Sequence, residues 1–265
     1  MDNKNLTREQ LLKIADMLAE EQLDKLNNRL VKVEYKESIY SKYIKRLLDI
    51  VLASILIVAT IPINIIIMII TFFDVGLPIF FTQERIGKDG KLFSLIKFRN
   101  MKEIYDSNGD LLPPDSRVTK WGYFVRKTSL DELLNFYSIL KGDMSIIGPR
   151  PLVPQYYHRF NNRHLARFYV KPGLELPPNS TKTIRGWNEQ FENDIWYVQN
   201  ISLKTDVKMF LLLFKFTFNK KNSNERGSAK RSSFMGYDEE GNVIDQNNIP
   251  SEYITQVIRG DVKGE

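Results

Sequence analysis

The chain has 265 residues, a net charge of +6 and no cysteine. Without cysteine it can form neither a disulfide framework nor a thiolate metal site, and two histidines are too few for a His-based metal site without carboxylates. The excess positive charge suits an anionic partner: a nucleic acid, an anionic membrane surface or a phosphorylated substrate. Because no nucleic-acid recognition motif is present, we expect no nucleic acid among the partners.

The N-terminal extension, residues 1–42, contains a pattern typical of an amphipathic helix between residues 7 and 32. Thr7 and Gln10 have the spacing of a capping box, in which each side chain bonds to the backbone of the other residue. Apolar residues then recur at helical spacing: Leu11, Ile14, Leu18, Leu26 and Leu30. We expect this helix to pack against the rest of the chain or against a partner.

Residues 43–76 hold the most hydrophobic stretch of the chain. The run from 47 to 73 carries one charge, Asp49, and as a helix would be roughly 40 Å long, against a bilayer core of ~30 Å. Pro62 removes a backbone donor near the middle and predicts a break or a kink. Lysines and arginines flank the run on both sides, a pattern that a re-entrant membrane helix with both ends in the cytoplasm would satisfy. Charge alone leaves an ordinary kinked span equally open.

Residues 77–221 have the mixed pattern of a small, helix-rich α/β domain. Strand-like stretches at 78–82 and 93–98 are joined by a turn that contains two glycines. Residues 129–141 predict a helix that ends at Gly142.

Two segments near the C-terminus differ sharply in composition. Residues 207–218 combine apolar, aromatic and lysine residues, which fits either an interfacial membrane helix or a core helix. Residues 222–265 are polar, and we expect them to form a tail with at most local structure.

Two adjacent carboxylates, Asp131 and Glu132, follow Arg126 and are the first candidates for chemistry. Ser129 and Glu132 have capping-box spacing, so the simplest interpretation is a helix start with Asp131 near the positive end of the helix dipole. A carboxylate here can also act as a nucleophile or bind Mg²⁺ when phosphates are present. The pattern alone favours capping.

Arg150 is the next candidate, because prolines at 149 and 151 fix the backbone on both sides of it. An arginine held in this way can bind phosphate through its planar guanidinium fork. The alternative is a rigid turn with an exposed arginine, which this segment alone favours.

Several segments taken together resemble the bacterial sugar transferase family, the monotopic phosphoglycosyl transferases. The similarity runs from about residue 43 to about residue 219, with the motifs in family order. The motifs are residues 45–49, 81–87, 97–101, 126–151, 170–173 and 194–198. The resemblance implies a re-entrant membrane helix and a small catalytic domain with interfacial amphipathic helices. It places this domain on the cytoplasmic face of the bacterial inner membrane.

The resemblance also implies a reaction, in which a sugar 1-phosphate passes from a UDP-sugar to polyprenyl (undecaprenyl) phosphate and UMP is released. Such a step begins the synthesis of an exopolysaccharide, capsule, O-antigen or glycoprotein glycan. The implied nucleophile is Asp131, which also binds the cofactor Mg²⁺, with Glu132 assisting. The implied phosphate-binding residues are Arg126, Arg150 and Lys97. UDP-sugar, polyprenyl phosphate and membrane lipid are the implied partners, and a homodimer or glycan-assembly enzymes are left open.

The sequence departs from the family pattern in two places. Ile61 precedes Pro62 where the family usually has serine, and residues 174–179 read Leu-Glu-Leu-Pro-Pro-Asn instead of a Thr-Gly-Trp-Ala loop. The second change affects the expected sugar or nucleotide contact. Two alternatives therefore stay open: an inactive homologue that organises glycan-assembly enzymes at the membrane, and a one-span anchor with an extracellular binding domain. The retained charged residues oppose the first alternative, and the basic flanks oppose the second.

Overall fold

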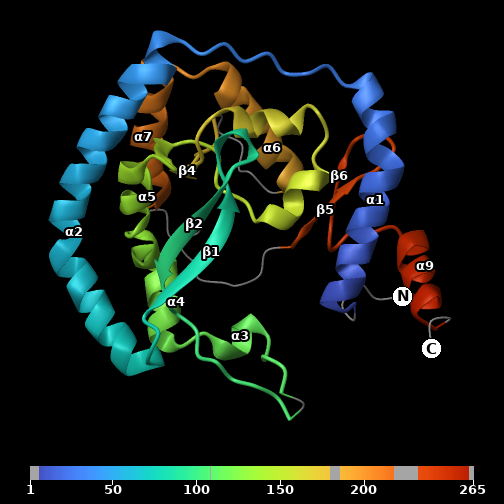
Figure 1. The fold of residues 1–265 in the computed structure, drawn as a ribbon, viewed down its shortest axis with the longest axis horizontal. Coiled ribbons are helices and arrows are strands. Elements are labelled where there is room, and N and C mark those ends of the chain that lie inside the picture. The colour runs from blue at the N-terminus through green and yellow to red at the C-terminus, as the bar shows by residue number, and fades with distance from the viewer. Residues whose placement is uncertain (1–5, 108, 180–185, 218–231, 263–265) are drawn as a thin grey trace.

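The computed structural model describes residues 6–107, 109–179, 186–217 and 232–262 (Figure 1). It confirms the expected mixed architecture, which is rich in helices with a few short strands. Within these residues the strands form three separate two-stranded sheets.

An antiparallel hairpin of β1 (Phe80–Ile86) and β2 (Leu92–Phe98) lies in the middle of the domain, as the strand-like sequence predicts (Figure 1). Residues directly opposite one another in such a ladder share a face of the sheet. One face carries three pairs: Phe81 with Lys97, Gln83 with Leu95, and Arg85 with Phe93. This register places basic side chains of both strands on the same side of the hairpin.

Short helices surround the hairpin. In chain order they are α3 (Pro114–Arg117), α4 (Lys120–Thr128), α5 (Asn135–Lys141), α6 (Trp187–Gln199) and α7 (Leu203–Thr217). Two 3₁₀ segments, Pro154–Arg159 and His164–Tyr169, lie between α5 and α6. The parallel strands β3 (Ser145–Ile147) and β4 (Gly173–Glu175) complete the domain, and its core is built from residues such as Ile139, Ile146, Tyr197 and Met209.

The long apolar segment forms a π-helical turn, Tyr40–Ile44, followed by α2 (Lys45–Val75). The expected break at Pro62 is absent, because α2 continues through it. A proline removes one backbone donor without obliging the helix to end, and the side chains beside it bond locally. Thr60 Oγ1 donates to the Leu56 carbonyl at 2.7 Å, and Asn64 Nδ2 donates to Thr60 Oγ1 at 3.4 Å. The helix is instead bowed around α5 and α7 (Figure 1).

Most of the surface of α2 is not covered by the rest of the chain. The helix from Tyr40 to Val75 is long and apolar enough to cross a membrane, and 17% of its most apolar window is buried. A helix that is apolar on nearly all faces and mostly exposed needs a nonaqueous environment. This pattern supports membrane association of the chain.

Polar contacts attach both ends of α2 to the globular domain. At its start, Lys45 Nζ lies 2.6 Å from Asp206 of α7, and Asp49 accepts hydrogen bonds from β3. At its end, Trp121 Nε1 donates to Thr71 at 3.1 Å. The two ends of one membrane-length helix are therefore held by a single domain.

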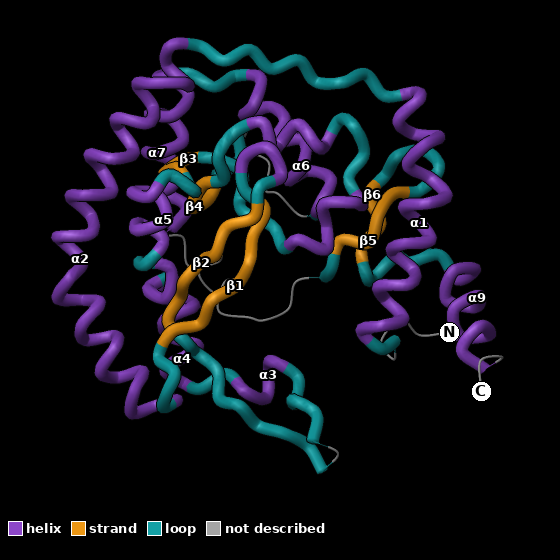
Figure 2. The backbone as a smooth tube through the Cα atoms, viewed as in Figure 1, coloured by secondary structure: helices purple, strands orange, loops and turns teal. Residues whose placement is uncertain are grey.

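The expected N-terminal helix is confirmed as α1 (Arg8–Arg29), with both hydrogen bonds of the Thr7–Gln10 capping box present. The expectation of a C-terminal tail is wrong for residues 232–262, which form β5 (Phe234–Tyr237), β6 (Val243–Asp245) and α9 (Ser251–Val262). Figure 2 shows these elements beside α1. The apolar residues of α9 recur at helical spacing, a pattern that the tail interpretation overlooked, and together with Met235 and Ile244 they pack against α1. Residues 222–231 of the expected tail lie outside the described part of the chain.

A shared aromatic cluster joins this terminal module to the rest of the domain. Phe234 is fully buried against Phe160, Trp187 and Phe191, and its carbonyl accepts a 2.9 Å hydrogen bond from Arg159. The same cluster includes Leu152, two residues after Arg150. Both ends of the chain thus support the segment that carries a candidate site residue.

Helix α7 has the buried face that a core helix requires, and its role as an interfacial membrane helix stays a prediction. Met209 is fully buried in the main core, while Val207 and Leu211 are exposed. One face of α7 therefore packs inside, and the other presents apolar side chains outward.

Candidate active site

Asp131 and Glu132 lie in a 3₁₀ turn, Leu130–Glu132, between α4 and α5. The predicted single helix over 129–141 and the predicted Ser129 cap are both wrong, because Ser129 has a left-handed backbone (φ 58°) and makes no side-chain cap bond. It terminates α4 instead, and a left-handed backbone at a residue other than glycine costs roughly 1 kcal/mol or more. Gly142 does end α5, with φ 104°. The two carboxylates are consequently displayed on a turn and do not serve as helix caps.

Glu132 is held by two cations from different parts of the chain. Lys97 Nζ of β2 and Arg150 Nη2 each lie 2.6 Å from its Oε1. Burial opposes ionisation of Glu132, but the charges of Arg150 and Lys97 outweigh it and hold its pKa below the ordinary value. Glu132 is therefore an anion at neutral pH that orients the two cations.

Asp131 has the opposite electrostatic setting. It is 6% exposed, and within the described residues its carboxylate accepts one hydrogen bond, from Asn100 Nδ2 to Oδ2 at 3.1 Å. Burial, and after it the charge of Glu132, raises the pKa of Asp131 to about 6. The Oδ1 atom is left for a substrate or an ion, and a carboxylate with a raised pKa is a stronger nucleophile than an ordinary one.

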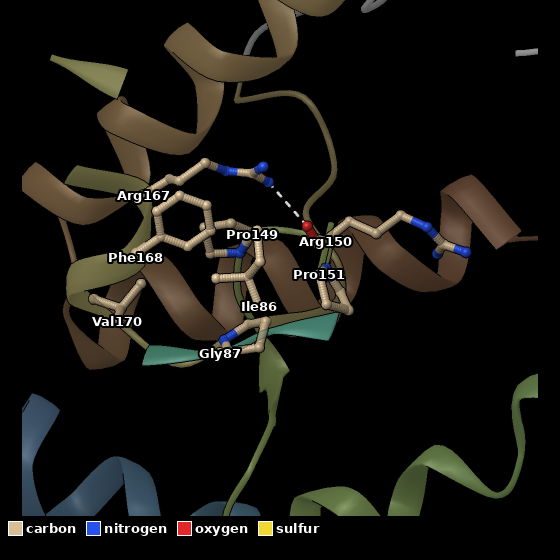
Figure 3. Close-up of a pocket in the computed structure, with 9 residues that line it drawn as sticks. Ile86, Gly87, Pro149, Arg150, Pro151, Arg167, Phe168 and Val170 are labelled. Carbon is tan, nitrogen blue, oxygen red and sulfur yellow. Dashed lines mark hydrogen bonds between the residues drawn. The ribbon is translucent and has the colours of Figure 1, made fainter. Parts of the chain in front are cut away.

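Arg150 bridges two carboxylates. Besides its contact with Glu132, its Nη1 lies 3.2 Å from Glu175 Oε2 and donates to the Leu174 carbonyl at 3.2 Å. The predicted rigid turn is reinforced from behind, because Arg167 Nη2 donates to the Arg150 carbonyl at 2.9 Å (Figure 3). In Figure 3 the Arg150 side chain extends away from Arg167, so the backbone is anchored while the guanidinium reaches the site.

Arg126 lies in the last turn of α4 and is partly buried. In the described part of the chain its side chain makes no hydrogen bond or ion pair, yet its charge favours the ionised form of Asp131. The structure thus joins Glu132, Lys97 and Arg150 by direct contacts. Asp131 is next to Glu132 in the chain, and the charges of Lys97, Arg126 and Arg150 act on it electrostatically. Pro62, the remaining residue singled out from the sequence, lies inside α2 and is not one of the contacting residues of this site.

Three residues near these groups were not predicted from the sequence: Arg85, Asn100 and Glu175. Arg85 and Asn100 stand in motifs that carry the family resemblance, and the hairpin register puts Arg85 on the same face as Lys97. Glu175 stands in the altered 174–179 loop. Its position depends on a close approach of Gly148 and Gly173, where a Cβ on Gly173 would lie 2.2 Å from the Gly148 nitrogen.

The oxygen chemistry of this cluster fits Mg²⁺. Among the described residues no three or more His, Cys, Asp or Glu side chains gather as a ready metal cage, and His158 and His164 are engaged elsewhere, with Asp16 and with Tyr237. Mg²⁺ is usually bound by one or two carboxylates completed by substrate phosphates and water. Asp131, with Oδ1 unbonded in the described chain, meets that requirement.

The family model described as bacterial sugar transferase matches residues 40–220. The chain belongs to this family. An uncharacterized sugar transferase, EpsL, of Bacillus subtilis (strain 168) is 40% identical over 171 residues, which cover 64% of this chain and 84% of that protein. The UDP-glucose:undecaprenyl-phosphate glucose-1-phosphate transferase of Escherichia coli (strain K12) is 34% identical over 192 residues, 68% of this chain and 41% of that protein.

A further relative is the UDP-N-acetylgalactosamine-undecaprenyl-phosphate N-acetylgalactosaminephosphotransferase of Aeromonas hydrophila. It is 32% identical over 185 residues, 65% of this chain and 42% of that protein. The chain therefore spans most of the Bacillus relative but less than half of these two transferases. The terminal module around α1, β5, β6 and α9 lies outside the matched family region.

Proposed function

We propose that the protein is a phosphoglycosyl transferase that moves a sugar 1-phosphate from a UDP-sugar to undecaprenyl phosphate and releases UMP. The observation that carries the proposal is Asp131, a buried carboxylate with a raised pKa beside Lys97, Arg126 and Arg150. Relatives named for this reaction with UDP-glucose and UDP-N-acetylgalactosamine support it. The product would start an exopolysaccharide, capsule, O-antigen or glycoprotein glycan.

The basic side chains give the site its affinity for a diphosphate. Lys97 and Arg150 are already oriented by Glu132, and Arg126 is not committed to a protein partner in the described chain. Cations fixed before the substrate arrives stabilise the charge that develops during phosphoryl transfer without further reorganisation.

The transfer proceeds in two displacements at phosphorus. A carboxylate oxygen of Asp131 forms a bond to the β-phosphorus as the bond from that phosphorus to the bridging oxygen breaks, and UMP leaves with this electron pair. A phosphate oxygen of the lipid then attacks the aspartyl-phosphosugar, and the Asp131 carboxylate is regenerated. Dividing the transfer in this way means that the soluble and lipid substrates need not meet.

Mg²⁺ bound by Asp131 and the donor phosphates would supply charge neutralisation at the diphosphate. Glu132, with its depressed pKa, acts in this scheme as an orienting anion and not as a proton carrier.

We further propose that α2 is a re-entrant membrane helix and that the domain lies on the cytoplasmic face of the bacterial inner membrane. A helix that crossed the bilayer would place its ends on opposite sides, but Lys45 and Thr71 both contact the same domain. The basic flanks of the run support the same topology. Exposed Tyr123 and Phe124 of α4, with Leu211 of α7, supply the apolar surface of interfacial helices.

In this proposal residues 43–76 form the membrane segment and 77–221 the catalytic domain. The described parts of the extension 1–42 and of the C-terminal region 222–265 form the terminal module, which packs against the catalytic domain. Its partners are proposed to be a second copy of the chain or glycan-assembly enzymes.

A second candidate function is a non-catalytic scaffold for glycan-assembly enzymes. Glu175 favours the scaffold function, because its carboxylate pairs with the Arg150 guanidinium at the position where a substrate phosphate is expected to bind. The two functions are separated by an assay of UMP release from a panel of UDP-sugars, with polyprenyl phosphate and Mg²⁺ in detergent. Lipid-dependent UMP release that stops in excess chelator and returns with Mg²⁺ supports the transferase. No release from any donor would support the scaffold.

A further inference from the structure

A small pocket lies beside Asp131, between the β1–β2 hairpin and the Arg150 turn. Its polar lining consists of Arg85, Lys97, Glu132, Asn135 and Arg150. Leucine, methionine and proline side chains complete the wall. Asp131 itself is not part of the lining, so the pocket extends the site away from the nucleophile.

Arg85 enters this pocket with unused hydrogen-bonding capacity. Its Nη2 donates to Gln83 Oε1 at 2.6 Å, but its Nη1 is buried and has no hydrogen-bond partner among the described residues. A buried donor without a partner is destabilising, because it loses its hydrogen bonds to water without replacing them. Such a group in a pocket points to a ligand that accepts hydrogen bonds.

Asn135, the first residue of α5, is the second residue of this pocket that has a buried polar atom without a partner among the described residues. It is 3% exposed, and its Oδ1 has no partner in the described chain. The oxygen and the nitrogen of an asparagine amide exchange places when the amide rotates by half a turn. In the rotated orientation Nδ2 takes the place of Oδ1 and can donate hydrogen bonds to a ligand that has acceptor atoms. Two buried unpartnered groups among the residues that line one pocket are consistent with a polar ligand there.

The charge of the pocket specifies an anion. Arg85, Lys97 and Arg150 contribute three cations, against Glu132 in the lining and Glu175 on Arg150. Burial, and after it the charge of Arg150, lowers the pKa of Arg85 to about 10, so Arg85 stays charged at neutral pH. Two like charges facing one pocket repel each other until an anion lies between them.

We propose that this pocket binds the phosphate of the departing nucleoside monophosphate, with Arg85 as a phosphate-binding residue. This inference rests on the proposed function, because it assigns the leaving half of the UDP-sugar to a place beside the nucleophile. A guanidinium there stabilises the negative charge that the leaving phosphate gains as its bond to the β-phosphorus breaks. The cationic and polar lining of the pocket is suited to a phosphoryl group.

The test compares a nucleotide, its nucleoside without phosphate, and a sugar phosphate without base. Isothermal titration of the purified full-length protein in detergent with UMP, uridine and glucose 1-phosphate gives the contribution of each group. The variants are Arg85→Gln and Arg85→Lys. The matched control is Arg259→Gln, at an exposed residue of α9. Near-ultraviolet circular dichroism checks the fold, and Arg85→Lys tests the fork geometry if Arg85→Gln does not fold.

We expect Arg85→Gln to weaken UMP binding at least tenfold while uridine binding stays unchanged, and Arg85→Lys to recover part of the loss. Equal UMP affinity in wild type and Arg85→Gln would overturn the assignment and leave the transferase proposal standing. A parallel loss of uridine and UMP binding would show a structural role and would also overturn it. A loss of affinity confined to glucose 1-phosphate would place the sugar phosphate of the donor in the pocket and would overturn the assignment to the leaving phosphate. A wild type that neither binds UMP nor releases it would overturn both proposals.

Discussion

Arg150 Nη2 lies 2.6 Å from Glu132 Oε1, so the arginine expected to bind substrate phosphate is held by the neighbour of the proposed nucleophile. The contact has two effects. It fixes the guanidinium fork before the donor arrives, and it keeps Glu132 ionised, so the Glu132 charge raises the pKa of Asp131. One ion pair thereby couples phosphate binding to the nucleophilicity of Asp131.

The pH dependence of the reaction follows from this coupling. Asp131 must be ionised to attack phosphorus, so we expect log(kcat/KM) to fall with a slope of one below about pH 6. Glu132→Gln removes a negative charge that disfavours ionised Asp131, so the acid limb moves to lower pH while the rate at neutral pH falls through loss of cation positioning. Initial rates of UMP release between pH 4.5 and 8 measure both effects. An acid limb that stays in place in Glu132→Gln contradicts the coupling.

Glu175 pairs with Arg150, so we expect it to compete with the donor phosphates for this arginine. Glu175→Gln removes the charge but keeps the shape, and Arg150 retains the Leu174 carbonyl. For a partly exposed pair we expect donor KM to decrease roughly two- to fivefold. Glu189→Gln, an exposed substitution on α6, serves as the control. A higher KM in Glu175→Gln would mean that Glu175 contacts the donor and does not exclude it.

The terminal module should be integral to the folded domain. Phe234 is fully buried among aromatic rings of the catalytic domain, so Phe234→Ala is expected to lower the free energy of unfolding by roughly 3–5 kcal/mol. Tyr105→Ala, at a half-exposed ring, should change it by less than about 1 kcal/mol. Denaturant unfolding in detergent measures the difference, and equal values for the two variants would show that the module does not share the core.

Membrane topology can be tested because the chain has no cysteine of its own. We expect single cysteines at Lys36 and Lys91, both exposed, to resist an impermeant maleimide in intact spheroplasts and to react after permeabilisation. Replacing Pro62 by leucine restores a backbone donor, straightens α2 and favours a true span, which would expose one of the two sites. Labelling of only one site in the otherwise unchanged protein would contradict the re-entrant helix.

The sequence predicted which residues gather at the site better than it predicted their local geometry. Lys97, Glu132 and Arg150 were expected from the family resemblance, and the structure joins them by direct contacts, with Asp131 next to Glu132. Capping by Ser129 was wrongly expected because a Ser-x-x-Glu pattern is typical of a helix start, whereas Ser129 adopts a left-handed backbone that ends α4.

Contacts between distant segments account for most of what the sequence did not predict. Helix α1 covers residues more than 200 positions away. Because no neighbouring segment of the sequence indicates this partner, the region after residue 232 was interpreted as a tail. Glu175 meets Arg150 only because Gly148 and Gly173 allow their strands to approach closely. Such contacts have no local signature in hydrophobic period or turn chemistry.

The central claim is that Asp131 carries the phosphosugar. Incubation of the protein with a suitable UDP-sugar and Mg²⁺, without lipid, should release one UMP per enzyme and add the mass of a phosphosugar to the peptide that contains Asp131, and polyprenyl phosphate should then discharge it. Asp131→Asn should form no adduct and lose several orders of magnitude in turnover with its fold unchanged. Normal turnover by Asp131→Asn, or an active wild type whose adduct forms at another residue, would contradict the account.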